Sequence, residues 1–399
     1  MTPSHQENGT DGKFLQSVTL RNVLSFGPFT DPLSLGCLNV FIGPNGSGKS
    51  NLIDALALLR AAPEDLRTVV RRGGGVREWI WKAAPRDAVA LIDAVVQNPR
   101  GGQALRHALS FMEENQGFRL CDERIENEIP YEGHDEPYLY YRYQVGRPIL
   151  NVRGEERRLT SEAVEPDVSI LAQRRDPEAY PEITFLAEAY SGIRIFREWA
   201  FGRNTVFREP QKADMRNDRL EEDFSNLGLF LNRLRRTPAA KRAILEALGE
   251  LYAGIDDFDV TVEGGTVQVF LVEGDFTIPA TRLSDGSLRY LCLLAILCDP
   301  TPPRLVCIEE PELGLHPDIL PKVADLLVEA SGRTQLIVTT HSDIIVDALS
   351  ERPETVVVCE KADRQTVMRR LDPDALSGWL REYRLGALWM SGQLGGTRW

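Results

Sequence analysis

The segment that most constrains this chain is the eight-residue loop GPNGSGKS at residues 43–50. Its fixed glycines, followed by Lys and Ser, match the pattern of a phosphate-binding loop. Gly43, Gly46 and Gly48 allow the backbone to turn tightly and to bring its N–H groups close to an anion. An apolar run at 37–42 predicts a buried strand before the loop, and leucines at helical spacing predict a helix after it. This order places a bound phosphate at a helix N-terminus.

The loop also carries the polar side chains that such a site needs. Lys49 supplies a point charge for phosphate oxygens, and the hydroxyl of Ser50 is a suitable ligand for Mg²⁺. We therefore predict a nucleotide-binding segment made of Gly43, Pro44, Asn45, Gly46, Ser47, Gly48, Lys49, Ser50 and Asn51.

Two adjacent carboxylates follow a second apolar run. Residues 305–308 predict a central strand, and Glu309 and Glu310 stand at its carboxyl end, where ligands collect in open α/β sheets. One carboxylate can hold Mg²⁺ and the next can orient an attacking water. We assign the metal to Glu309 and the water to Glu310. The alternative is an ordinary acidic loop after a strand.

Two further segments suggest anion contacts. LSDGS at 283–287 directly precedes a predicted helix, so Ser284, Gly286 and Ser287 lie at a helix N-terminus, which attracts anions. His341 follows the apolar run 336–338 and can hydrogen-bond a phosphate. The alternatives are a simple helix cap for LSDGS and a capping or surface histidine for His341.

Together these motifs resemble the ABC-type ATPase heads. Residues 43–50 match the Walker A loop, 283–287 the signature loop, 305–310 Walker B, and His341 the switch histidine. LGLHP at 313–317 looks like the segment that contacts the opposite subunit in that family. The arrangement is closer to SMC, RecF and OLD-type heads than to membrane transporters. It is similar to bacterial predicted AAA/ABC ATPases linked to DNA repair or anti-phage defence.

The resemblance implies an ATPase that uses ATP and Mg²⁺. Glu310 and His341 would be catalytic, and Ser50 and Glu309 would hold the metal together with Gln173 as the Q-loop residue. Ser284, Gly286 and Ser287 would complete the nucleotide site of a second copy, in a homodimer or higher homo-oligomer. The sequence departs from the family in having Asp285 within the signature and Glu309 where Asp is usual.

The implied fold is α/β: a P-loop NTPase with an ABC-ATPase-like head, a mainly parallel sheet, an antiparallel β lobe and a mixed α/β insertion. We expect a disordered N-terminus at 1–14, an ATPase core at 15–65 and 275–399, and an inserted lobe at 66–274, with antiparallel strands followed by helices. The sequence has no sustained heptad pattern, so we do not expect the long coiled-coil arm of SMC proteins. The 58 residues after His341 are too few for a TOPRIM nuclease domain, so a nuclease would be a separate effector chain.

The net charge of the chain limits how it can bind nucleic acid. A net charge of −13 excludes a generally basic, nucleic-acid-coating surface. Two local stretches are basic, and each is either a set of salt-bridged helix faces or a DNA phosphate contact. The first holds Arg67, Arg71, Arg72, Arg77 and Lys82, and the second holds Arg233, Arg235, Arg236, Lys241 and Arg242.

Other features predict a cytoplasmic protein. Six cysteines lack metal-ligand spacing and are expected to be reduced thiols. No apolar stretch approaches the roughly 18 residues of a membrane helix, and the N-terminus lacks a signal-peptide core. Trp379, Trp389 and Trp399 near the C-terminus are either core residues or a docking surface for a partner.

The sequence thus favours an ATP-sandwiched dimer that drives or gates a nucleic-acid-linked defence or repair complex with a separate effector. The alternative is a scaffold in which the ATP-bound assembly matters more than turnover. The soluble subunit of a membrane transporter is a distant third interpretation, because the insertion and LGLHP both speak against it.

Overall fold

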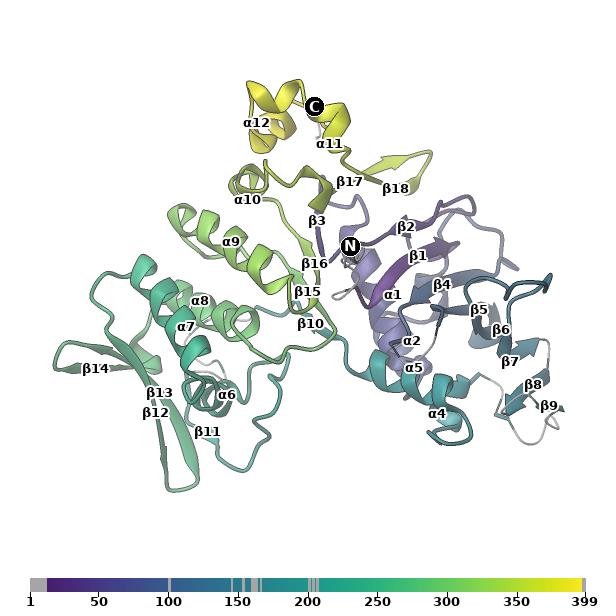
Figure 1. Cartoon of the computed structure of the whole chain (residues 1–399), viewed down its shortest axis with the longest axis horizontal. Helices are drawn as coiled ribbons and strands as arrows, with labels where there is room; N and C mark the ends of the chain where they lie inside the picture. Colours follow the sequence, from purple (N-terminus) through teal and green to yellow (C-terminus); the bar gives the residue numbers. More distant parts are fainter. Residues whose placement is uncertain are drawn as a thin grey trace, which may run out of the picture. The chain divides into compact units, whose positions relative to one another are not determined.

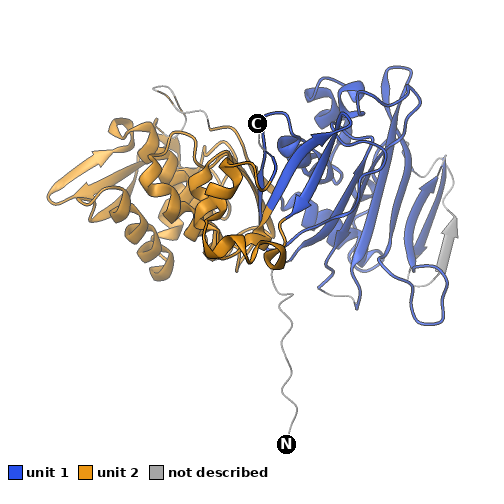
Figure 2. Ribbon diagram, turned by 90° about the horizontal axis from the view of Figure 1, so that it is seen from above, with its two compact units in different colours: residues 1–193, 357–370, 395–399 blue, residues 194–356, 371–394 orange. Residues whose placement is uncertain are grey.

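The computed structural model describes residues 13–99, 102–144, 146–152, 155–158, 164–165, 167–199, 202, 205 and 208–396. The chain divides into two compact units, coloured separately in Figure 2. Unit 1 comprises residues 1–193, 357–370 and 395–399, and unit 2 comprises residues 194–356 and 371–394.

Unit 1 contains a large antiparallel sheet with the strand order β2-β1-β4-β5-β6-β7-β8-β9 (Figure 1). The turn between β5 and β6 uses Asn115 and Gln116, whose φ angles of 51° and 65° suit a tight hairpin. The strands are β1 (Leu15–Arg21), β2 (Leu33–Ser34), β4 (Ala90–Val96), β5 (Leu105–Glu114), β6 (Gly117–Asn127), β7 (Leu139–Gln144), β8 (Arg147–Val152) and β9 (Glu155–Arg158).

The remaining elements of unit 1 are three strands and its helices, and the phosphate loop connects one of these strands, β3, to helix α1. β3 is buried along its whole length, lies beside β17, and leads through the loop into α1. Helix α1 contacts α2 and α5, and α5 also contacts α4. These elements are β3 (Leu38–Ile42), β17 (Val356–Ala362), β18 (Gln365–Arg370), α1 (Lys49–Ala61), α2 (Leu66–Arg72), α3 (Val76–Trp79), α4 (Ile170–Gln173) and α5 (Pro181–Ser191).

Unit 2 contains a parallel set of strands in the order β10-β15-β16. Helix α8 is buried around its whole circumference from Leu288 to Leu297, as expected of a helix inside a core. It contacts α6, α7 and α9. The elements are β10 (Arg194–Phe196), β15 (Leu305–Glu309), β16 (Gln335–Thr339), α8 (Asp285–Leu297), α9 (Leu320–Ala330) and α10 (Asp343–Ala348).

The rest of unit 2 is a small antiparallel sheet with two flanking helices, and a C-terminal helical segment in which α12 packs on α10. The elements are β11 (Gln211–Lys212), β12 (Asp257–Glu263), β13 (Thr266–Glu273), β14 (Phe276–Pro279), α6 (Leu227–Leu234), α7 (Pro238–Leu251), α11 (Pro373–Leu376) and α12 (Leu385–Met390). Short 3-10 turns lie at Ala280–Arg282, Pro317–Ile319, Pro353–Thr355 and Trp379–Arg381.

The two units differ from the predicted core and insertion. Strand β1, expected in the core, pairs along its length with β4, expected in the insertion. Likewise β10 pairs in parallel with β15, in which the partner of Ile195 is Cys307, 112 residues later in the chain (307 − 195). The hydrogen-bonded sheets therefore cross the predicted boundaries at 65 and 274.

The ordered N-terminal segment begins earlier than predicted. Phe14 is buried, and its ring packs edge-on against Tyr190 at a centroid distance of 6.4 Å. Its carbonyl accepts a hydrogen bond from the N–H of Gln97. The predicted disorder therefore does not extend to residue 14, and the remainder of that prediction, 1–12, lies outside the described residues. In the part of the chain that the structure describes, no helix is long and apolar enough to span a membrane.

Candidate functional site

The phosphate loop lies in unit 1 between β3 and α1, as predicted. Its backbone approaches β17 and β18 so closely that side chains are excluded. At Gly43, with φ 145°, an added Cβ would lie 2.2 Å from the carbonyl oxygen of Cys359. At Gly48, with φ 105°, it would lie 2.1 Å from Oγ1 of Thr366. Both positions therefore require glycine for two reasons, the left-handed backbone and the contact.

Lys49 is buried, and its ammonium group lies against the loop itself. Nζ donates to the carbonyl oxygens of Gly43 at 2.7 Å and Pro44 at 3.2 Å. The nearby hydroxyl of Ser47 is buried without a hydrogen-bond partner among the described residues. A buried cation and an unpaired hydroxyl beside a turn of glycine backbone suit an anionic oxygen ligand, so the residues present fit a phosphate.

A hydroxyl network braces the loop from outside. Asn51 donates through Nδ2 to Oγ of Ser25 at 2.7 Å, and that hydroxyl lies 2.6 Å from Oγ1 of Thr366. Thr366 in turn donates to the carbonyl oxygen of Ser47 at 2.8 Å. Asn51 was predicted as part of the site, whereas Ser25 and Thr366 were not. Their hydroxyls come from segments remote in sequence, so no local pattern identifies them.

Gln173, the predicted Q-loop residue, forms its side-chain hydrogen bonds within its own turn. Its side-chain oxygen accepts from the N–H of Glu165 at 2.8 Å, and its nitrogen donates to the carbonyl oxygen of Val168 at 2.7 Å. Nearby, Arg175 donates to the carbonyl oxygen of Pro63, which follows the C-terminal end of α1. Since α1 is about 20 Å long, this segment lies toward the end opposite the phosphate loop. The amide stabilises its own turn, and the metal role of Gln173 stays a prediction from the family resemblance.

The acidic strand end lies in unit 2, at the carboxyl end of β15. Arg197 and Trp199 follow β10, the parallel neighbour of β15, and reach Glu309 from there. Nη2 of Arg197 lies 3.7 Å from Oε1 of Glu309, and Nε1 of Trp199 donates to the Glu309 carbonyl oxygen at 2.6 Å. Arg197 and Trp199 were not predicted from the sequence, since only the β10–β15 pairing brings them to this edge.

Glu310 and His341 lie close together, at the sheet edge where the sequence placed both of them. Nε2 of His341 lies 3.7 Å from Oε1 of Glu310, and both side chains are about one-third exposed, at 34% and 37%. Glu310 adopts φ 47°, and its N–H donates to the carbonyl oxygen of Thr339 at 2.9 Å. This backbone conformation is uncommon outside glycine, and such outliers concentrate at functional sites.

Glu312 positions His341 from the other side. Its carboxylate oxygen accepts a hydrogen bond from the backbone N–H of His341 at 2.7 Å. Desolvation raises the pKa of Glu312 above its usual range, although the His341 hydrogen bond opposes the shift. Glu312 thus holds the backbone of His341, while the His341 side chain faces Glu310.

Arg289 places a buried positive charge beside these acids. It lies on α8, and its guanidinium carbon is 4.7 Å from the centre of the Trp199 ring, a cation–π contact. Burial lowers the pKa of Arg289 to about 10, while Glu312 and Glu310 oppose the shift. The group is therefore still charged at neutral pH, and its charge balances the nearby carboxylates.

LSDGS forms the N-terminus of α8, and Ser284 is its N-cap. The Ser284 hydroxyl accepts from the N–H of Ser287 at 3.1 Å. Arg208 donates to the carbonyl oxygen of Leu283 at 2.7 Å and forms an ion pair with Asp285. Gly286 packs on the 313–317 segment, since an added Cβ would lie 2.9 Å from the Gly314 carbonyl oxygen. The cap interpretation is thus correct as local structure, and Ser284 is exposed while Ser287 is partly exposed.

The predicted magnesium ligands Ser50 and Glu309 each have a side-chain oxygen suited to Mg²⁺. Ser50 is exposed at the start of α1, and Glu309 presents a carboxylate at the strand end. Among the residues that the structure describes, no group of three or more His, Cys, Asp and Glu side chains is arranged to hold a metal ion. Mg²⁺ in nucleotide sites is commonly held by one or two protein ligands, water and substrate phosphates.

Outside these motifs, the tryptophans near the C-terminus differ in how far they are buried. Trp389 is buried in α12, whereas Trp379 is 48% exposed and its ring lies tilted against that of Tyr383 at a centroid distance of 6.2 Å. Trp399 lies outside the described residues. The six cysteines are free thiols, and burial raises the pKa of the Cys121 thiol to about 11.

Comparison with known proteins places the motifs in one family. The model of the family described as "AAA domain, putative AbiEii toxin, Type IV TA system" matches residues 38–347, from the start of β3 into α10. A comparison with curated proteins found no match.

Solved structures share the fold. A crystal structure of the SmcHead bound to the C-winged helix domain of ScpA has a TM-score of 0.55 at 16% identity, covering 92% of this chain and 100% of that one. Smc head domains derived from Pyrococcus furiosus and Pyrococcus yayanosii have TM-scores of 0.53 and 0.52 at 14% and 11% identity. Each covers 92% of this chain and 99% of its own. The predicted P-loop NTPase head fold is therefore confirmed.

Proposed function

The chain belongs to the AAA-domain family whose model matches residues 38–347, and from this premise we propose that it is a Mg²⁺-dependent ATPase. The observation that carries the proposal is the geometry of the phosphate loop. Gly43 and Gly48 hold it against β17 and β18, and Lys49 lies buried against its carbonyl groups. When a nucleotide binds, the ammonium of Lys49 exchanges these carbonyl contacts for phosphate oxygens.

We assign different tasks to the two adjacent carboxylates. Glu310 acts as the base that orients and polarises water, and His341 at 3.7 Å from it contacts the developing phosphate charge. Ser50 and Glu309 are the side chains suited to hold Mg²⁺. When bound, the ion neutralises phosphate charge during the reaction. Arg197 beside Glu309 limits repulsion between the neighbouring acids.

We further propose that ATP draws two copies of the chain together. Ser284, Gly286 and Ser287 are exposed or partly exposed at the N-terminus of a 13-residue helix, where backbone N–H groups favour an anion. The chain already has its own phosphate loop, so this second anion-ready terminus suits the nucleotide of a second copy. Such a pairing is isologous and gives two equivalent sites per dimer.

The wider role that we propose is to drive or gate a nucleic-acid-linked defence or repair complex, with the effector on a separate chain. An SMC head of the same fold is bound to a domain of another protein, ScpA, which supports a head-plus-partner arrangement. The competing proposal is a scaffold whose ATP-bound assembly matters and whose turnover is negligible. Measurement of turnover in the assembled state separates the two proposals.

The test of ATP use is Lys49→Ala, with Lys212→Ala as the control because Lys212 is an exposed lysine in unit 2. We expect Lys49→Ala to lose ATP binding in calorimetry and hydrolysis in a phosphate-release assay, while the control matches the natural protein. Undiminished ATP affinity in Lys49→Ala would refute the assignment of the phosphate loop.

A further inference from the structure

The two basic stretches differ in how the structure neutralises their charge. In the second stretch, Arg233 pairs with Asp299 at 2.9 Å, and Lys241 pairs with Asp257 at 2.7 Å. Arg235 also forms an ion pair, with Asp259. Acidic residues of unit 2 thus compensate most of this stretch, which has the character of salt-bridged helix faces.

The first stretch is compensated only in part. Arg67 pairs with Asp65 at 3.2 Å, and Lys82 pairs with Glu78 at 2.6 Å. In the described parts of the chain, Arg71, Arg72 and Arg77 have no acidic partner within 4 Å, and neither does Arg86 a few residues later. Arg71 and Arg72 occupy the last turn of α2, where positive charge complements the helix dipole. Arg77 lies in α3, which has only four residues and so a small dipole, and Arg86 lies in the loop before β4.

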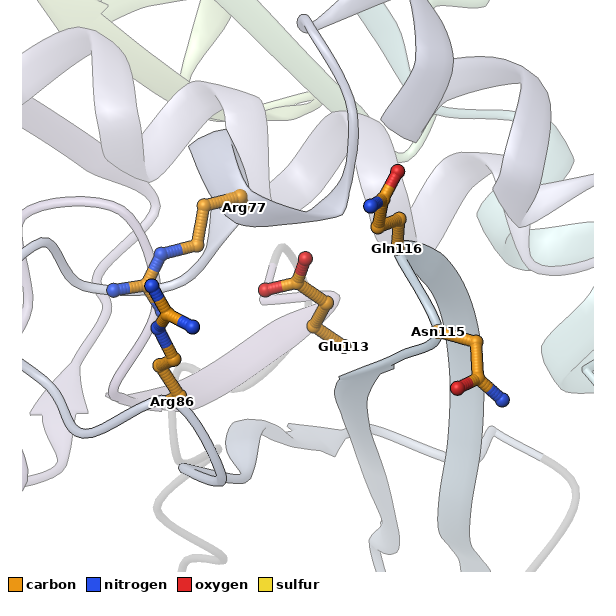
Figure 3. Close-up of a pocket in the computed structure, with 5 residues that line it drawn as sticks. All are labelled: Arg77, Arg86, Glu113, Asn115 and Gln116. Carbon is orange, nitrogen blue, oxygen red and sulfur yellow. The ribbon is translucent and has the colours of Figure 1, made fainter.

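Arg77 and Arg86 line a pocket of about 610 Å³ in unit 1, shown in Figure 3. Arg77 comes from α3, Arg86 from the loop before β4, and the opposite wall is the β5–β6 turn with Glu113, Asn115 and Gln116. The two guanidinium groups point to the same side of the pocket, and the Glu113 carboxylate points toward them. Nη1 of Arg77 is buried without a hydrogen-bond partner among the described residues.

The charges of this pocket suit an anion with several acceptor oxygens. The guanidinium groups of Arg77 and Arg86 repel each other, and the single negative charge of Glu113 offsets only one of their two positive charges. The buried N–H group of Arg77 without an acceptor also costs free energy. Arginine forks match phosphate oxygens in particular. The pocket is also wide, and the amides of Asn115 and Gln116 can each donate and accept hydrogen bonds to sugars or bases.

We propose that this pocket binds the phosphodiester backbone of a nucleic acid strand. Arg77 and Arg86 contact phosphates, Asn115 and Gln116 contact the adjoining nucleoside, and Arg71 and Arg72 extend the positive potential along α2. The inference rests on the nucleic-acid-linked role proposed above, but it does not depend on ATP turnover.

The test measures binding of the full chain to fluorescent duplex DNA, single-stranded DNA and RNA of equal length, over a range of salt concentrations. We expect Arg77→Gln/Arg86→Gln to weaken binding by about tenfold or more and to lower the salt slope by about two for duplex DNA. Glu113→Gln neutralises the acid that lines the pocket and is expected to tighten binding. The three probes show which strand type supplies the phosphodiester.

The matched control is Arg235→Gln/Lys241→Gln, which removes the same two charges from the compensated stretch. It is expected to leave affinity and salt slope unchanged. Equal weakening by both double variants, or no change in either pocket variant, would overturn the proposal. Lys49→Ala separates the proposal of ATP use from the proposal of nucleic-acid binding. We expect this variant to bind nucleic acid normally even if it loses ATP binding.

Discussion

At the scale of single residues, Glu309 and Glu310 are neighbours with different surroundings. Glu309 ends β15, with the guanidinium of Arg197 at 3.7 Å from its carboxylate. Glu310 leaves the strand in a left-handed conformation and faces His341 instead. A short acidic pair in the sequence is therefore divided by the backbone into one carboxylate beside a cation and one beside an imidazole, which favours two separate roles.

The first prediction separates these roles. Glu310→Gln keeps the volume of the side chain but removes the base, so we expect ATP affinity within a few-fold of natural and turnover reduced by about 100-fold or more. Glu309→Gln is expected instead to raise the Mg²⁺ concentration needed for half-maximal turnover by about tenfold or more. Full turnover of Glu310→Gln in steady-state kinetics would disprove the assignment of the base.

The second prediction concerns Arg289 as a positioning residue. Arg289→Met removes the buried charge beside Glu312, so we expect kcat to fall about tenfold while ATP affinity stays unchanged. Glu312→Gln neutralises the partner, and the Arg289→Met/Glu312→Gln double variant is expected to regain part of the loss. A double-mutant cycle with additive effects on kcat would show that the two residues act independently.

At the scale of elements, the phosphate loop depends on a close fit between its backbone and β18. Oγ1 of Thr366 would lie 2.1 Å from a Cβ at Gly48, and Oγ of Ser25 would lie 2.7 Å from it. At Gly46, with φ 77°, no atom lies within 4 Å of an added Cβ. These two glycines therefore separate backbone strain from steric contact.

The third prediction uses this pair. Gly46→Ala is expected to lower the free energy of unfolding by about 1–2 kcal/mol, the cost of a left-handed alanine. Gly48→Ala carries the same strain together with the contact to Thr366, which adds about 1–3 kcal/mol. Chemical denaturation without nucleotide measures both values. Equal losses for the two variants would show that the contact with β18 is unimportant.

The success of sequence-based prediction at this scale follows from the range of the interactions. The strand, loop and helix around residues 38–61 were predicted correctly, because the glycines, the apolar run and the helical spacing are local signals. Arg197 and Arg208 were missed, because their roles depend on β10 pairing with β15 and on a contact with the start of α8. The metal role of Gln173 rests on the family resemblance alone, because its amide hydrogen-bonds within its own turn.

At the scale of the whole molecule, the sheet pairings decide the organisation. The sequence predicted the P-loop NTPase head fold, which the SMC head structures confirm. It did not predict the two units, because pairing of β1 with β4 joins segments assigned to the core and to the insertion. The order of the motifs can be read directly from the sequence. The neighbour of each strand in a sheet depends instead on packing between segments that are far apart in the chain.

The central claim at this scale is that two copies share each ATP, and Ser284→Arg tests it. The variant places bulk and charge at the N-cap of α8, so we expect ATP binding to persist while dimerisation and hydrolysis fail. Lys49→Ala is defective in the other half of the site. A mixed pair of the two variants contains one site with both defects and one site with neither.

The most direct measurement is therefore the ATPase rate of Ser284→Arg and Lys49→Ala proteins, each alone and mixed in equal amounts. Neither variant is expected to dimerise with itself, so the dimers that form are mixed pairs with one intact site of two, and we predict recovery of up to about half of the natural rate from two inactive proteins. Normal hydrolysis by Ser284→Arg alone as a monomer, or a mixture as inactive as its components, would contradict the shared-site account.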